Sequence, residues 1–493
     1  MTTANSFKDQ GNSFYTKGKY EDAEKQYTKG IELLNTATTI EEKKLLSILY
    51  CNRAMSNIQL KNYELALEDA KQSISSYNQF PKAYLRAGDA YLALKKYREA
   101  KEMYLTCIRY ITSSEPTLLE QATNALQNAK MKLFYEPILE SRPDMYGKVE
   151  IKYLDSVKEK ALFAKQDIKQ GEIVFSDEPF IHHISNDSFI KHSDSICFHC
   201  IKFIQPVDPA VKCPNHSICK YQFCSEKCME SSTMYHSQAC NQNDLDIVNQ
   251  YRVSIATAPT CTQLLLAERL VSMISYLLKT KKAKNCNLAL GSITHLKRGS
   301  LMKQQPSFNG SNLDQLQQQY TPLLNILKET YGLKTKEELE NQLLVDEFNK
   351  LFSVDFFDNL LGMINFNSTS TVVKSPNQEI NNNNNSSNGN NNKNKNKKNS
   401  NNNSNKVEIS SWGVGLFPIF SCMNHSCSPN IEITNEIIDG VDSVKMVVKA
   451  KKNIPMGTEI FHSYCDENLP IKQRQSILSH QYGFKCQCLK CKK

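Results

Sequence analysis

Eight cysteine and histidine residues in the segment 197–240 restrict most strongly what this chain can fold into. They form four pairs: Cys197-x2-Cys200, Cys213-x5-Cys219, Cys224-x3-Cys228 and His236-x3-Cys240. Thiolates and imidazoles at such spacings are the usual ligands of tetrahedral zinc, and eight of them complete two sites. His216 competes with Cys213 for one position, and we favour Cys213 because a thiolate is the commoner ligand. The sequence therefore predicts two zinc ions in a segment too small to fold without metal.

The composition predicts a protein of a reducing compartment. Its 17 cysteines, many of them at ligand spacing, favour metal binding over disulfides. The N-terminus lacks an apolar signal-peptide core, and nowhere do 18 apolar residues run together. The net charge of +9 is modest for 493 residues and comes partly from one low-complexity segment, so it does not indicate the clustered basic face of a nucleic-acid-binding protein. We expect a cytoplasmic protein, with access to the nucleus, that binds neither membranes nor nucleic acids directly.

Residues 1–137 show a helical pattern with a repeat of 34 residues, the spacing of Ala54 and Gly88. Small and large residues occupy the positions where the paired helices of tetratricopeptide repeats (TPRs) cross closely. The predicted repeats cover about residues 4–37, 47–80 and 81–114, followed by a capping helix over residues 116–135. About nine extra residues, near positions 36–44, are expected to lie between helices. Three repeats and a cap are enough to bury a continuous core.

Five polar residues of this array are expected to face its concave groove. Lys8 and Asn12 are four residues apart on one helix, and Lys82 and Arg86 are four apart on another, so each pair points the same way. Asn52 belongs to the second repeat. The set resembles the dicarboxylate clamp of co-chaperone repeats, which implies binding of the acidic C-terminal tails of cytosolic heat-shock chaperones. Ordinary solvated polar residues are the alternative, and five positions in register favour the clamp.

The stretch Ser421 to Asn430 concentrates polar chemistry beside a core element. It places an amide, an imidazole and a thiol within four positions, at Asn424, His425 and Cys427, after an apolar run that predicts a strand. This stretch resembles the cofactor motif of SET-domain lysine methyltransferases. Other parts of such a domain are similar to residues 161–173 (an opening hairpin), 457–464 (a tyrosine strand) and 486–491 (a post-SET cluster). With the cysteine block between them, residues 147–493 resemble the SET and MYND family.

The resemblance implies transfer of a methyl group from S-adenosylmethionine to a lysine of a protein substrate. Attack requires a neutral amine, which a narrow apolar channel favours by desolvation. Tyr464 would orient that amine with its hydroxyl. The expected cofactor-binding residues are Asn424, His425, Lys158, Lys160, Tyr482 and Phe484.

The resemblance also assigns the zinc ligands. In the finger, the first and third pairs would hold one ion, and the second and fourth pairs the other. A third ion would join Cys427 to the C-terminal residues Cys486, Cys488 and Cys491, pinning the end of the chain against the cofactor motif. The finger is expected to be structural or to bind peptides, proline-rich ones included.

The implied fold is a multidomain α+β chain: an all-α repeat array, then a β-rich SET domain interrupted by a MYND zinc finger and a helical insert. The expected divisions are residues 147–196 (first SET part), 197–240 (finger), 241–360 (helical insert), 361–466 (SET core) and 467–493 (post-SET). Thr260-x2-Gln263 predicts a capping box within the insert. Residues 377–405, rich in Asn, are expected to be disordered. Residues 431–435 and 444–450 are expected to form a hairpin.

One stretch departs from the family pattern. Where the opening loop of a SET domain usually has Gly-x-Gly, this chain has Glu159-Lys160-Ala161. Glycines there permit close backbone approach and unusual dihedral angles, so the departure predicts weakened cofactor binding. The alternative function is therefore a catalytically inactive adaptor, in which the SET fold and the finger link chaperones to partner proteins.

Overall fold

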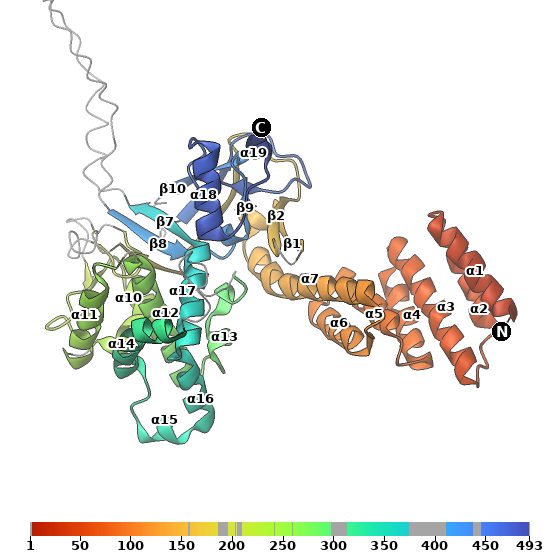
Figure 1. Ribbon diagram of the computed structural model, residues 1–493, viewed down its shortest axis with the longest axis horizontal. Helices are drawn as coiled ribbons and strands as arrows, with labels where there is room; N and C mark the ends of the chain where they lie inside the picture. The colour runs from red at the N-terminus through yellow and green to blue at the C-terminus, as the bar shows by residue number, and fades with distance from the viewer. Residues whose placement is uncertain are drawn as a thin grey trace, which may run out of the picture. The chain divides into compact units, whose positions relative to one another are not determined.

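The computed structural model describes residues 2–155, 158–185, 196–202, 204, 210–240, 242–258, 260–296, 313–373, 411–436 and 445–492. The chain divides into two compact units, residues 1–165 and 166–493 (Figure 1). The predicted disordered segment at residues 377–405 lies outside the described residues.

The first unit is a stack of antiparallel helix pairs, as the repeats predict. Its helices are α1 (Thr2–Thr16), α2 (Tyr20–Glu32), α3 (Ile40–Gln59), α4 (Tyr63–Ser76), α5 (Pro81–Ala93), α6 (Tyr97–Tyr110), α7 (Pro116–Glu140) and α8 (Pro143–Tyr146). The pairs cross closely because glycines face tyrosines. A Cβ atom on Gly11 would lie 2.4 Å from the ring of Tyr27, and one on Gly88 would lie 2.4 Å from the ring of Tyr104. The same contact thus recurs in the first and third repeats.

The extra residues predicted to lie between helices, near positions 36–44, are placed differently from the prediction. The loop ends at Thr39, whose side chain accepts a hydrogen bond from the backbone of Glu42 at 3.3 Å, while the Glu42 carboxylate accepts one from the backbone of Thr39 at 3.1 Å. This capping box starts α3 at Ile40. The expectation that residues 36–44 lie between helices is therefore wrong for residues 40–44, which lengthen the helix instead.

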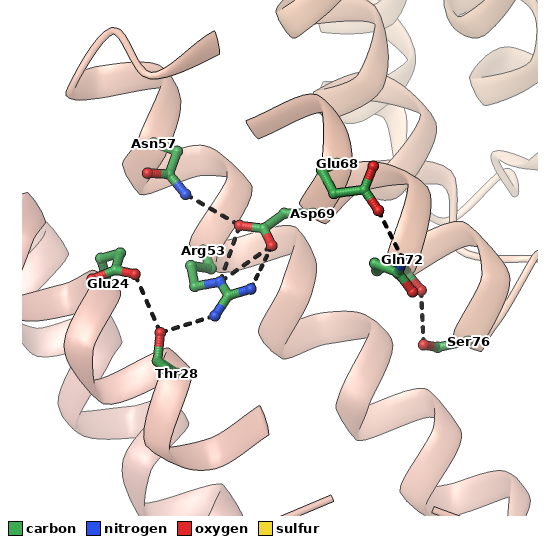
Figure 2. A network of polar contacts seen from close by, with 8 residues as sticks. All are labelled: Glu24, Thr28, Arg53, Asn57, Glu68, Asp69, Gln72 and Ser76. Carbon is green, nitrogen blue, oxygen red and sulfur yellow. Dashed lines mark hydrogen bonds and ion pairs between the residues drawn. The ribbon is translucent and has the colours of Figure 1, made fainter. Parts of the chain in front are cut away.

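A polar network joins the second pair of helices to the first (Figure 2). Arg53 on α3 contacts Asp69 on α4 through Nη2 to Oδ1 at 2.6 Å and Nε to Oδ2 at 3.0 Å. Its Nη1 donates to Thr28 on α2 at 2.9 Å, and Asn57 donates to Asp69 at 3.1 Å. The Asp69 carboxylate is only 4% exposed, so its charge depends on these donors for compensation.

We expect the substitution Asp69→Ala to lower the free energy of unfolding of this array by about 3 kcal/mol, because it leaves Arg53 and Asn57 without their acceptor. The measurement is urea-dependent amide exchange of α3 and α4 in the full chain. Glu68→Ala is the matched control, since this exposed neighbour bonds only to Gln72 among the contacts drawn in Figure 2, and it should change stability by less than about 0.5 kcal/mol. Equal effects of the two substitutions would contradict the prediction.

A two-stranded hairpin completes the first unit. β1 (Val149–Tyr153) pairs antiparallel with β2 (Lys160–Ala164), in the register Val149↔Ala164 to Tyr153↔Lys160, and β1 packs on α7. The predicted hairpin between residues 161–164 and the segment after residue 167 is therefore wrong. β2 pairs with the strand that precedes it, because Val149 and Ile151 supply a buried face that alternates along β1.

In its described residues, the second unit holds three small sheets outside the finger. β3 (Ile173–Asp177) pairs with β11 (Lys445–Ala450), which pairs with β10 (Ile431–Glu436). β8 (Ser411–Leu416) lies between β4 (Ile181–Ile184) and β7 (Ser368–Val373). β9 (Asn424–His425) pairs with β12 (Phe461–His462). β10 and β11 are antiparallel, as the predicted hairpin requires, and its turn lies outside the described residues.

The described helices of the second unit lie in the finger, in the predicted helical insert and in the C-terminal segment. They are α10 (Glu226–His236), α11 (Gln242–Ile255), α12 (Cys261–Lys279), α13 (Cys286–Ala289), α14 (Leu313–Tyr331), α15 (Lys336–Glu340), α16 (Gln342–Leu351), α17 (Val354–Asn367), α18 (Ile471–Tyr482) and α19 (Leu489–Lys492). The predicted capping box is wrong: α12 begins after Thr260, but the Thr260 side chain accepts no capping hydrogen bond, since its backbone is not extended there.

α12 is the central helix of the second unit. Its buried residues contribute to the largest apolar cluster, together with side chains from α11, α14, α16 and α17. Within the part of the chain that the structure describes, α12 also has the length and apolar composition of a membrane span, but 78% of that window is buried by protein. Its apolar surface is therefore already covered by the core.

Candidate active site and zinc centres

The pairing of β9 with β12 builds the candidate active site. These parallel strands align Asn424 with Phe461 and His425 with His462, and the backbone N–H of Ser426 donates to the carbonyl of His462 at 3.0 Å. The two strands come from the predicted cofactor motif and from the predicted tyrosine strand. Tyr464 follows β12 directly and thereby reaches the residues of the cofactor motif.

Tyr464 lies in an aromatic cluster. Its ring centroid is 4.7 Å from that of Tyr482, 5.2 Å from that of His425 and 6.3 Å from that of Phe484. Its hydroxyl donates to the carbonyl oxygen of Met423 at 2.9 Å. Burial raises the pKa of this hydroxyl, so it stays protonated and remains a hydrogen-bond donor at neutral pH.

Asn424 is held by a carboxylate that the sequence analysis did not single out. Its Nδ2 donates to Oε1 of Glu459 at 2.8 Å. The backbone around Glu459 is held in turn by Asn430, which donates to the Glu459 carbonyl at 2.9 Å and accepts from the N–H of Phe461 at 2.8 Å. Glu459 and Asn430 both lie inside the motifs that carried the SET resemblance, but no spacing rule connects residues so far apart in sequence.

The two histidines of this cluster are neutral at neutral pH. Burial, with the positive charge of Arg474, lowers the pKa of His425 to about 4. Burial, with His425 nearby, lowers the pKa of His462 to about 3. Both ring nitrogens of His425 contact protein atoms: Nδ1 lies 2.9 Å from the backbone nitrogen of Tyr464, and Nε2 lies 3.2 Å from Sγ of Cys427. A contact from this ring to a cofactor would break one of these bonds, so the backbone of His425 is the better candidate for cofactor binding.

Lys158 and Lys160 belong to the first unit, where Lys158 precedes β2 and Lys160 is its first residue. Lys160 is buried and Lys158 is exposed. Between them, Glu159 has a φ of 58° and forms a tight turn in which the N–H of Lys160 bonds to the carbonyl of Lys158 at 2.7 Å. This left-handed conformation favours glycine and costs other residues about 1–2 kcal/mol. Glu159 thus keeps a glycine-like backbone, and the expected contact of both lysines with the cofactor carboxylate stays a prediction.

Two interleaved ligand sets occupy the finger. The ligand atoms of Cys197, Cys200, Cys224 and Cys228 all lie within 4.8 Å of one another. So do those of Cys213, Cys219, His236 and Cys240. The short hairpin β5 (Val211–Lys212) and β6 (Gln222–Phe223) and the start of α10 position them. His216 is exposed and outside the second set, so Cys213 takes the contested position.

The spacing of the finger ligands suits zinc. In the first set, Sγ of Cys224 lies 3.5 Å from Sγ of Cys200 and 3.5 Å from Sγ of Cys228. In the second set, Sγ of Cys213 lies 3.3 Å from Nε2 of His236. Tetrahedral zinc with Zn–S bonds of about 2.3 Å separates its sulfur ligands by about 3.8 Å. The two clusters have the same members as the predicted interleaved pairs, and their binding of zinc stays a prediction.

A third ligand set joins the cofactor motif to the C-terminal segment. It consists of Cys427, Cys486, Cys488 and Cys491, with Sγ of Cys427 at 3.9 Å from that of Cys486 and 3.5 Å from that of Cys491. Arg474 on α18 donates to Sγ of Cys491 at 3.6 Å. The geometry fits the predicted post-SET zinc site, and the adjacent guanidinium offsets the negative charge of four thiolates.

Arg269 attaches the finger to α12, a role that the sequence analysis missed. Its guanidinium lies over the rings of Phe198 and Tyr235, at 4.6 Å and 4.5 Å from the ring centroids, and donates to the carbonyls of Phe198 and His182. The side chain is 3% exposed. The sequence did contain a signal for this role, since Arg269 lies within the apolar stripe of α12. A charged side chain buried there requires polar or aromatic partners.

The predicted clamp residues are partly engaged within the first unit. Oδ1 of Asn12 accepts hydrogen bonds from Nδ2 of Asn52 at 3.0 Å and from the hydroxyl of Tyr27 at 2.8 Å. Lys8 donates to Asn5 at 3.0 Å. The two clamp amides therefore meet, although they lie 40 residues apart in sequence.

An acidic residue that the sequence analysis missed lies beside the clamp arginine. Arg86 pairs with Asp89 at 2.9 Å, and Asp89 also accepts from the hydroxyl of Tyr104 at 3.0 Å. Asp89 repeats the position of Asn12, since each follows the glycine that crosses a tyrosine, and each accepts from that tyrosine. The internal repeat could have revealed this equivalence.

Comparison with known families matches two parts of this chain. The SET domain model matches residues 159–465, and the tetratricopeptide repeat model matches residues 48–80 and 81–112. Mouse protein-lysine N-trimethyltransferase SMYD5 is 22% identical over 385 residues, which cover 70% of this chain and 86% of that protein. Protein-lysine N-methyltransferase SMYD4 of Pongo abelii is 22% identical over 98% of this chain and 66% of its own length. The first TPR of Spaghetti (RPAP3) bound to an HSP90 peptide is 30% identical and covers 27% of this chain and 94% of its own, with a TM-score of 0.23.

Proposed function

Because this chain belongs to the SET-domain family, we propose that it is a protein-lysine N-methyltransferase that uses S-adenosylmethionine. The observation that carries the proposal is the β9–β12 pairing, which brings Tyr464 to the residues of the cofactor motif. The partly buried aromatic cluster and the polar groups of Asn424 and its neighbours suit a cofactor with a flat base and a charged end. When bound, S-adenosylmethionine supplies an electrophilic methyl group.

The residues of the site would act on the substrate lysine by positioning and desolvation. The partly buried rings of Tyr464, Tyr482 and Phe484 would exclude water around a bound substrate lysine, so that its amine would lose its proton more readily than in solution. The Tyr464 hydroxyl remains protonated, and it would orient the amine toward the methyl group. Holding the reacting atoms in line is most of the catalysis in such a transfer. The three clusters with four ligand atoms each would hold zinc and shape the site without taking part in the reaction.

Calorimetric titration of the zinc-loaded protein with S-adenosylmethionine tests this proposal. We expect micromolar binding that is lost in an Asn424→Ala variant, followed by methyl transfer to lysines on an array of candidate proteins. Absence of binding would favour the alternative function, an inactive SET and MYND adaptor. The left-handed backbone at Glu159 supports binding, because the turn keeps the shape that a glycine would give it.

We further propose that the repeats recruit the enzyme to acidic C-terminal tails of heat-shock chaperones. Lys8, Asn12, Asn52, Lys82 and Arg86 would contact the terminal carboxylate and an acidic side chain of the tail, and the Asn12–Asn52 bond supports their convergence. Such partners, together with the cysteine usage, favour the cytoplasm, with access to the nucleus. The finger would remain available for proline-rich peptides.

The substitution Lys82→Ala is expected to weaken binding of a fluorescent acidic C-terminal peptide by about tenfold or more, because one charge-assisted hydrogen bond is lost. Fluorescence anisotropy with the full chain measures this. Lys71→Ala, an exposed lysine on α4, is the matched control and should leave affinity unchanged. Equal weakening in both variants would mean that the groove acts only through its overall charge.

The substitution Asp89→Asn is expected to strengthen binding of the same peptide about fivefold. The carboxylate beside Arg86 repels an acidic ligand, and its removal relieves about 1 kcal/mol, the energy of two unit charges about 4 Å apart in water. The asparagine would still accept from Tyr104, since Asn12 accepts from Tyr27 in the same way. Unchanged or weaker binding in the anisotropy titration would contradict the prediction.

A further inference from the structure

The ring of His425 connects the C-terminal thiolate cluster to Tyr464 through two hydrogen bonds. A backbone N–H can only donate, so Nδ1 of His425 must accept from Tyr464 and carries no proton. In the neutral ring the proton then resides on Nε2, which faces Sγ of Cys427 at 3.2 Å. The contact to Tyr464 therefore determines the tautomer, and the tautomer makes the ring a donor toward Cys427.

The strength of Cys427 as the acceptor for this proton depends on whether zinc is bound. Cys427 belongs to the set Cys427, Cys486, Cys488 and Cys491, and cysteines bind zinc as thiolates. An N–H bond to a thiolate is charge-assisted and stronger than one to a neutral thiol. Zinc at this site would therefore hold the ring in the orientation and the tautomer in which Nδ1 accepts from the backbone of Tyr464.

We propose that His425 is a positioning residue that transmits zinc occupancy of the C-terminal cluster to the backbone of Tyr464. When zinc occupies the cluster, the bond from His425 to Cys427 fixes the imidazole ring, and the ring in turn fixes the backbone of Tyr464. An empty cluster leaves a weaker sulfur acceptor, and the ring is freer to turn away from the Tyr464 amide. This link deepens the proposed methyltransferase function and rests on it for its importance, but its geometry involves only residues of the chain.

Two substitutions separate the two bonds of the ring. In His425→Asn the side-chain oxygen can replace Nδ1 as an acceptor for the Tyr464 amide, but nothing reaches Cys427. In His425→Gln the longer side chain can replace Nε2 as a donor to Cys427, but the acceptor near Tyr464 is lost. A purely structural histidine would not respond in opposite ways to these two changes.

The experiment measures two properties of each zinc-loaded variant. Competition with a chromophoric chelator gives the affinity of the C-terminal zinc, which a Cys491→Ser variant identifies by its absence. Amide exchange followed by mass spectrometry gives the protection of the Tyr464 amide. We expect His425→Asn to lose about tenfold or more in zinc affinity and to keep the protected amide. We expect His425→Gln to keep zinc affinity and to exchange the Tyr464 amide about tenfold faster.

Any other pattern overturns the link. If zinc affinity and amide protection fall together in both variants, His425 is a packing residue. If both variants lose zinc affinity and both keep the protected Tyr464 amide, the ring serves only the metal. Amide protection in β10 and β11, which lie outside the cluster, controls for global unfolding. Neither measurement requires a methyl acceptor or S-adenosylmethionine, so failure to detect methyl transfer would refute the proposed function and leave this result unaffected.

Discussion

Replacing Tyr464 with phenylalanine is expected to lower the rate constant of methyl transfer by about 100-fold while leaving the affinity for S-adenosylmethionine within about threefold. The hydroxyl is the only part removed, and a small misplacement of reacting atoms already costs about 100-fold. The ring contacts with Tyr482 and His425, at 4.7 Å and 5.2 Å, would remain. Single-turnover kinetics with labelled cofactor measure the rate constant, and calorimetry measures the affinity.

Tyr482→Phe is the matched control for this prediction. It removes the same group from the neighbouring ring of the proposed cofactor site, and because only the Tyr464 hydroxyl is assigned to the amine, the rate constant should fall by less than about threefold. Loss of the bond from Tyr464 to the Met423 carbonyl should cost about 1 kcal/mol of stability, too little to unfold the unit. A full transfer rate in Tyr464→Phe would remove the tyrosine from the mechanism, and lost cofactor binding would assign it to the cofactor site instead.

The substitution Cys228→Ser is expected to reduce the zinc content from three ions per chain to two and to abolish protection of the finger against amide exchange. Cys228 is fully buried and supplies one of four thiolates. Structural zinc supplies about 10–16 kcal/mol in zinc-finger peptides at neutral pH, far more than a segment of this size gains from its apolar cluster. Atomic absorption gives the zinc content, and mass spectrometry locates the unprotected segment.

Cys261→Ser controls for the chemical change itself. Cys261 is also buried, at the start of α12, but belongs to none of the ligand sets within the described residues. Its substitution should leave three zinc ions bound. Retention of three ions in Cys228→Ser would mean that another donor replaces it, and the assignment of this ligand set would then be wrong.

The candidate ligands of the finger and the helical repeats were predictable because both follow short-range patterns. The pairing of the finger ligands, and the joining of Cys427 to the C-terminal cysteines, were implied by the family resemblance. Ligand spacings in the finger translate directly into local turns and one helix start, and the structure brings the predicted sets together. The crossing of Gly11 with Tyr27 and of Gly88 with Tyr104 likewise follows from a fixed repeat. In such cases, neighbours in space are close or regularly spaced in sequence.

Strand pairing was predicted poorly where several partners were available. The segment 161–164 could pair with the strand before it or after it, and burial of Val149 and Ile151 decided for the former. The helix start at Thr260 had suitable residues for a capping box, but tertiary packing set a backbone conformation that excludes the bond. Local propensity is a weak guide when packing of α12 stabilises the helix anyway.

The sequence by itself determined the repeat array and the family motif at Asn424 to Cys427, because each follows from the spacing of a few residues, and it predicted the ligand sets that the structure brings together. Only the tertiary structure decided that Glu459 holds Asn424, that Asp89 neutralises Arg86, and that His425 lies between Cys427 and Tyr464. These contacts depend on hydrogen-bond directions between elements far apart in the chain. Such directions arise when the elements pack, and no spacing rule encodes them.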